Sequence, residues 1–195
     1  MSKLNVPVTA AAKKIPLQVS AVTDIEMYVH AHGDQHVSKG LEEGGIWEPF
    51  ETDLIIALLK RAKNFIDVGA NIGYYSVIAS KLLGDAGVVF AFEPEAHNFA
   101  LLQKSLGYNQ CSNTIAVAAA LSDTDGEGHI HLSEDNYGDH QIYEGAVSRN
   151  TQVIKLLNGS GYLADKITSI DVLKIDTQGA EYHVVKGLLP LLEKS

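Results

Sequence analysis

The sequence predicts a three-layer α/β fold built on a mostly parallel sheet. From about residue 64 onward, short apolar segments alternate with segments of helical spacing. This is the pattern of parallel strands joined by right-handed crossover helices. The apolar segments show little polar alternation, as expected when helices cover both faces of a sheet. With 195 residues, 46% of them hydrophobic, the chain is large enough for one sizeable core.

The expected strands and helices follow one another in pairs. Strands are expected at residues 64–68, 88–92, 114–120 and 170–175. Helices are expected at residues 51–62, 72–83, 95–106 and 180–189. Glycines end the second and third helices, and Pro190 ends the last. In the first helix, Leu54, Ile55, Leu58 and Leu59 are expected to face the core.

Two domains of unequal size are expected. Residues 1–44 would form an N-terminal arm and strand segment, and residues 45–195 the main domain. In the arm, residues 1–20 are weakly patterned, whereas residues 25–30 alternate in polarity and predict a strand. Residues 128–133 alternate in the same way and predict a hairpin arm off the main sheet.

Composition argues against several kinds of partner. A net charge of −9 without a cluster of Lys and Arg is poorly suited to nucleic acid. No segment approaches the roughly 20 apolar residues that span a bilayer, and no signal-peptide core is present, so we expect a cytoplasmic protein without membrane contact. Cys111 is the only cysteine, which leaves no disulfide framework. The histidines near residues 30 and 130 are interpreted as loop and hairpin residues, so no metal is expected.

A glycine-containing turn, residues 67–73, follows the first core strand. In open α/β sheets, ligands bind beyond the carboxyl ends of the strands. Gly69 and Gly73 allow a tight turn and a close approach of the backbone to a ligand. Glu93 stands twenty residues beyond Gly73, at the end of the second strand. A carboxylate at that place can accept hydrogen bonds from both hydroxyls of a ribose, so the two features predict a nucleoside cofactor.

The acid in this turn distinguishes between nucleoside cofactors. A dinucleotide site has the pattern G-x-G-x-x-G, whereas here Asn71 replaces the middle glycine. Asp67 would repel a pyrophosphate by on the order of 1–4 kcal/mol, but it would attract an ammonium and a sulfonium group. The turn therefore favours S-adenosylmethionine (SAM) over NAD. The alternative is a tight strand–helix connection that binds no ligand.

Four segments, in this order, resemble the FkbM family of methyltransferases: residues 65–76, 92–95, 119–123 and 173–181. The resemblance covers about residues 45–195. It implies a Rossmann-like class I methyltransferase fold, SAM as the methyl donor, and usually O-methylation of a hydroxyl on a sugar, polyketide or other small molecule.

Matching the motifs also implies roles for individual residues. The residues that would cradle the methionine part of SAM are Asp67, Gly69, Asn71 and Gly73. Glu93 would hold the ribose hydroxyls, and Ser122 and Asp123 would lie beside the adenine. Asp176 would end the fourth strand and face the reacting methyl group.

Methyl transfer needs an aligned hydroxyl and a group that removes its proton. Asp176 is the first candidate for this base, or for a substrate anchor; the alternative is a helix-capping or structural role. His140 is the second candidate, because histidine titrates near neutral pH. Glu181 falls in the first turn of the last helix and would stabilise its N-terminus.

Two departures from the family pattern affect the expected function. Residues 156–161 lack the acidic pair that members often carry before the fourth strand. The class I sheet normally has three further strands, so we expect a sheet without its C-terminal strands. Its exposed apolar edge at residues 170–175 would favour a homo-oligomer. Two functions follow: an O-methyltransferase acting on a small-molecule hydroxyl, or a catalytically inactive SAM-binding module that acts through oligomerisation.

Overall fold

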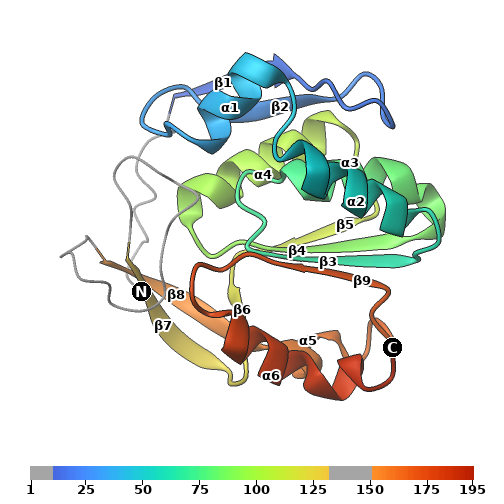
Figure 1. The fold of residues 1–195 in the computed structure, drawn as a ribbon. Coiled ribbons are helices and arrows are strands. Elements are labelled where there is room, and N and C mark those ends of the chain that lie inside the picture. The colour runs from blue at the N-terminus through green and yellow to red at the C-terminus, as the bar shows by residue number, and fades with distance from the viewer. Residues whose placement is uncertain (1–10, 132–150) are drawn as a thin grey trace.

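The computed structural model describes residues 11–131 and 151–195. Four parallel strands form its central sheet in the order β5-β4-β3-β9 (Figure 1). In chain order they are β3 (Asn64–Val68), β4 (Val88–Phe92), β5 (Thr114–Val117) and β9 (Val172–Ile175). The mixed α/β fold with a mostly parallel sheet, predicted from the sequence, is confirmed.

Helices cover both faces of this sheet (Figure 1). On one face lie α2 (Pro49–Leu59), α3 (Tyr74–Leu83) and α4 (Ala96–Tyr108); on the other lie α5 (Gly159–Leu163) and α6 (Glu181–Leu192). A short 3₁₀ turn, η1 (Gly84–Ala86), follows α3. Alternate strand residues point to opposite faces. Phe65 therefore packs with the α2 and α3 side chains, whereas Ile66 packs with those of α5 and α6. Burial on both sides explains why most residues of these strands are apolar; the buried exceptions in β3 are Asn64 and Asp67.

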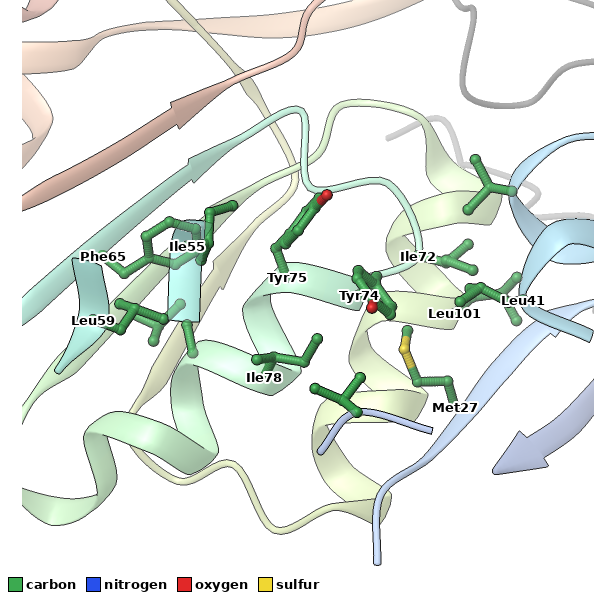
Figure 2. Packing of buried hydrophobic residues seen from close by; sticks show 14 of the residues in the cluster. Met27, Leu41, Ile55, Leu59, Phe65, Ile72, Tyr74, Tyr75, Ile78 and Leu101 are labelled. Carbon is green, nitrogen blue, oxygen red and sulfur yellow. The ribbon is translucent and has the colours of Figure 1, made fainter. Parts of the chain in front are cut away.

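The N-terminal segment packs on the helices of the first face. It consists of an antiparallel hairpin, β1 (Ala12–Pro16) with β2 (Glu26–His30), and of α1 (Val37–Gly44). Met27 and Leu41 from this segment join one buried cluster with Ile72, Tyr74 and Leu101 (Figure 2). This cluster crosses the boundary predicted between residues 44 and 45.

Strand β2 confirms the strand predicted at residues 25–30, but β1 was not foreseen in the weakly patterned residues 1–20. Its two lysines bond to carboxylates that are distant in the sequence, Lys13 to Glu42 and Lys14 to Glu26. Pairing with β2 completes the strand, and none of these contacts leaves a local signal.

A second sheet of three strands, in the order β6-β8-β7, extends from the end of β5. Its strands are β6 (Ala120–Ser122), β7 (Gly126–His131) and β8 (Thr151–Asn158). The strand predicted at residues 114–120 is therefore divided between two sheets, with a turn in which the N–H of Ala119 donates to the carbonyl of Val117. The hairpin arm predicted at 128–133 corresponds to β7, which pairs antiparallel with β8.

Two helices differ from the prediction. In α2 the buried side chains are Thr52, Ile55 and Leu59, whereas Leu54 and Leu58 are 51% and 50% exposed. The core thus takes only one stripe of this helix. Pro190 does not end α6, which continues to Leu192. Among the described residues, no helix is long and apolar enough to cross a membrane.

In the described part of the chain, β9 lies at one edge of the central sheet. Apolar side chains are exposed on the two helices that flank this edge on opposite faces (Figure 1). They are Phe50, Leu54 and Leu58 on α2, and Tyr182, Val185 and Leu189 on α6. Spacings of three and four residues place each group on one side of its helix.

Candidate functional site

A cavity of about 240 Å³ lies at the carboxyl ends of β3, β4 and β9. Among its lining residues are Gly69 and Asn71 from the turn after β3, Glu93 after β4, and Asp176 after β9. The N-terminal segment supplies another part of the lining. The topology therefore collects at one end of the sheet several side chains that are far apart in the sequence.

The turn after β3 is held in one conformation by the protein itself. Gly69, Asn71 and Gly73 have φ angles of 77°, 51° and 92°, a region that favours glycine. A Cβ on Gly69 would lie 1.9 Å from the carbonyl oxygen of Asp176, and one on Gly73 would lie 2.5 Å from Leu102. The close approach that these glycines permit is to the loop after β9 and to α4; Gly69 also lines the cavity, whereas Gly73 does not.

Asp67 lies beneath the turn, fully buried. Its Oδ2 accepts a hydrogen bond of 2.6 Å from the Ser76 hydroxyl, and its Oδ1 lies 3.3 Å from Nζ of Lys174. The same ammonium donates to the carbonyl of Gly69 at 2.9 Å. Asp67 does not line the cavity, so the carboxylate that the sequence assigned to the methionine part of SAM is instead engaged in an internal ion pair. Lys174, which the sequence analysis did not consider, does line it.

Glu93 is 5% exposed and is oriented by two backbone donors. Its Oε2 accepts from the N–H of Asn71 at 2.7 Å and its Oε1 from the N–H of Glu95 at 2.9 Å. Burial raises the pKa of Glu93 to about 7, although both backbone bonds act in the opposite direction. Asn71 adds a buried Oδ1 that has no hydrogen-bond partner among the described residues. The β4 end of the cavity therefore offers acceptors to a ligand that carries hydroxyl or amine donors.

Asp176 lines the cavity with a side chain that is half exposed. Its Oδ1 accepts from Gln178 at 3.0 Å, and its Oδ2 is 3.9 Å from Nζ of Lys174. The backbone N–H groups of Thr177 and Gly179, which precede α6, donate to Glu181 instead. Glu181 thus stabilises the start of α6, and the side chain of Asp176 faces the cavity.

Ser122 and Asp123 do not line the cavity. Lys186 Nζ donates to Asp123 at 2.7 Å, and His183 Nδ1 lies 3.1 Å from it; these two α6 partners hold the pKa of Asp123 well below its usual range. The position follows from close packing, since a Cβ on Gly187 would lie 2.0 Å from the carbonyl of Ser122. The adenine role implied by the resemblance gains no support from this geometry. At this side the cavity is lined by Ala120 and Ile130.

His140, the second candidate base, lies outside the described residues. In the described ranges, no group of three or more His, Cys, Asp and Glu side chains is arranged to hold a metal ion.

One wall of the cavity was not predicted at all. It comes from the segment that joins α1 to α2 and includes Trp47 and Glu48. The carboxylate of Glu48 accepts a hydrogen bond of 2.9 Å from the hydroxyl of Tyr75, the second residue of α3. Only the folded chain brings Glu48 to the turn after β3.

The methyltransferase FkbM domain model matches residues 67–195, which is more than half of the chain. The chain belongs to the FkbM methyltransferase family. This match includes the turn after β3, Glu93 and Asp176, so most of the cavity lining lies within the matched residues, whereas the wall with Trp47 and Glu48 lies outside them.

Two solved structures are similar to parts of this chain. The crystal structure of methyltransferase FkbM from Methylobacillus flagellatus KT is 18% identical, with a TM-score of 0.44, and the match covers 65% of this chain and 29% of that one. A structure described as "putative rRNA-methylase" from Clostridium thermocellum is 20% identical, with a TM-score of 0.33, and the match covers 35% of this chain and 37% of that one. None of the curated proteins matches the sequence.

Proposed function

We propose that the chain binds SAM in the cavity at the carboxyl ends of β3, β4 and β9, and transfers its methyl group to a hydroxyl of a small molecule. Membership of the FkbM methyltransferase family supports a methyltransferase role. The observation that carries the nucleoside part of this proposal is Glu93, a buried carboxylate that two backbone N–H groups hold at the end of β4, and the family supplies the choice of SAM. In this fold class, an acid at that place accepts hydrogen bonds from ribose hydroxyls.

The rest of the lining is compatible with the other parts of SAM. Phe92, Pro94, Ala120 and Ile130 form an apolar region near Glu93, suited to an adenine ring. The unpartnered Oδ1 of Asn71 can accept from a donor of the ligand. Carboxylates at Glu48 and Asp176 suit a ligand that carries positive charge.

SAM would supply the methyl group on a sulfonium, which is already a good leaving group, and its sulfur would keep the electron pair of the carbon–sulfur bond. Asp176 would take the proton of the acceptor hydroxyl, whose oxygen receives the methyl group. Gln178 fixes one oxygen of Asp176. Lys174, anchored on Asp67 and on the Gly69 carbonyl, holds the loop after β9 against the glycine turn.

The test is transfer of labelled methyl groups from SAM to a panel of small molecules that carry hydroxyl groups, sugars and polyketides first. Labelled product that appears with the wild-type chain and is lost with Asp176→Asn supports the proposal. Binding of SAM without transfer to any acceptor would favour a non-catalytic SAM-binding module.

A further inference from the structure

The cavity raises the question of which carboxylate meets the ammonium group of the methionine part of SAM, a question that rests on the proposed function. Asp67 is excluded by its surroundings. It is fully buried, it is engaged by Ser76 and Lys174, and it does not line the cavity. Its Oδ1 has no hydrogen-bond partner among the described residues, but Nζ of Lys174 lies 3.3 Å from it, so a ligand's ammonium would compete with a buried ion pair there.

Three carboxylates line the cavity: Glu48, Glu93 and Asp176. Glu93 is bonded to two backbone N–H groups at the β4 end and is the acceptor proposed for the ribose hydroxyls. Asp176 shares the field of Lys174, whose ammonium is 3.9 Å from it. Among the ion pairs of the described residues, none includes Glu48. Glu48 is exposed, and a cation can approach its carboxylate without displacing an ammonium partner.

Glu48 has an unusual backbone for a residue with a long side chain. Its φ is 41° and its ψ 70°, in the left-handed region, and it directly precedes Pro49. Such a conformation is uncommon outside glycine, asparagine and aspartate, and strain of this kind gathers at ligand sites. Glu48 is the N-cap of α2, yet its side chain makes no capping hydrogen bond. Helix capping by the carboxylate does not account for its placement.

The carboxylate is oriented toward the cavity by Tyr75. The tyrosine hydroxyl donates to it at 2.9 Å, and Tyr75 is 5% exposed at the start of α3. Burial raises the pKa of Tyr75, which keeps the hydroxyl protonated and able to donate. Neighbouring Trp47 lines the same wall. We propose that Glu48 is the carboxylate that binds the ammonium group of the methionine part of SAM, and that Tyr75 positions it.

Calorimetry on the full chain tests this inference with three ligands: SAM, S-adenosylhomocysteine and 5′-methylthioadenosine. The last has the ribose and adenine but no amino-acid part. Glu48→Gln should weaken binding of the first two by about tenfold or more, a change of about 1.4 kcal/mol, and leave methylthioadenosine affinity unchanged. Glu51→Gln, on an exposed residue of the first turn of α2, is the matched control and should bind all three ligands like the wild type.

The outcomes distinguish failure of the Glu48 role from failure of SAM binding itself. If Glu48→Gln weakens binding of all three ligands equally, Glu48 only shapes the wall of the cavity. If binding of all three is unchanged, Glu48 contacts no charged group of the ligand. Either result overturns the inference about Glu48, while SAM binding by the wild-type chain stands. If the wild-type chain binds none of the three, the proposed function fails, and this inference with it. Tyr75→Phe should weaken SAM binding less than Glu48→Gln does, because the carboxylate of Glu48 remains.

Discussion

If Glu93 accepts the ribose hydroxyls as proposed, binding of the nucleoside should depend on pH in a direction that the burial of Glu93 determines. In the ligand-free protein its pKa is raised to about 7. Ribose hydroxyls need the ionised carboxylate, because a protonated acid has lost acceptor capacity. Affinity should therefore be lost as the pH falls through 7. With a pKa of about 7, the ionised fraction falls about tenfold between pH 8 and pH 6.

The ligand for this measurement is 5′-methylthioadenosine, which carries the ribose but no amine that titrates near neutral pH. Calorimetry at pH 6, 7 and 8 should show affinity about tenfold weaker at pH 6 than at pH 8. At pH 7, in buffers of different ionisation enthalpy, binding should release about half a proton. Both effects should disappear in Glu93→Gln, whose remaining affinity should be lower because charged acceptors are the stronger ones.

The same group should affect the free energy of unfolding, with a sign that follows from the raised pKa. Between pH 4.5 and about 7, the folded state holds a proton that the unfolded state has released. The stability linked to Glu93 is thus present below pH 4.5 and is lost as the pH rises through 7. The rise of the pKa from 4.5 to about 7 corresponds to a loss of roughly 3 kcal/mol in the free energy of unfolding above pH 7.

The calorimetric result that would refute the assignment of Glu93 to the ribose is an affinity for 5′-methylthioadenosine that is flat from pH 6 to 8, without proton release.

Three further predictions concern chemistry, folding and association. Asp176→Asn should slow methyl transfer by roughly 10²–10⁴-fold, the scale of general-base loss. Calorimetry should show that the SAM affinity of this variant changes by less than about tenfold. Collapse of SAM binding with unchanged turnover would mean that Asp176 is a cofactor ligand. Lys174→Met should lower the free energy of unfolding in urea by roughly 3–5 kcal/mol by leaving Asp67 unpaired. The double variant with Asp67→Asn should recover part of this lost stability. Losses of stability that simply add in the double variant would contradict the pairing. The apolar stripes beside β9 predict a dimer that Leu54→Glu or Tyr182→Glu weakens in sedimentation equilibrium; a wild-type monomer at every concentration would contradict it.

The strand–helix core could be predicted from the sequence because its signals are local. Burial on two faces makes β3 and β4 largely apolar, and glycines follow α3 and lie near the end of α4. Strand β1 could not be predicted, since its partners are β2 and acidic residues distant in the chain. The exposed stripe of α2 was assigned to the core because spacing shows which residues share a side, but not how much of that side the core covers.

Some residues of the candidate site could likewise be predicted from the sequence, and others could not. Asn71, Glu93 and Asp176 lie directly after strands, where parallel topology brings side chains together, and all three line the cavity. The role expected of Asp67 depended on a neighbour that no local pattern reveals, since Lys174 reaches it from a strand more than a hundred residues later. Glu48 was missed because its place at the cavity depends on the path of the N-terminal segment over α3.

The most direct test of the account is calorimetric titration of the wild-type chain with S-adenosylhomocysteine and, separately, with NAD. S-adenosylhomocysteine should bind and NAD should not, because the proposed ribose site at Glu93 lies among acidic groups that disfavour a pyrophosphate. Binding of NAD without binding of S-adenosylhomocysteine would contradict the central claim.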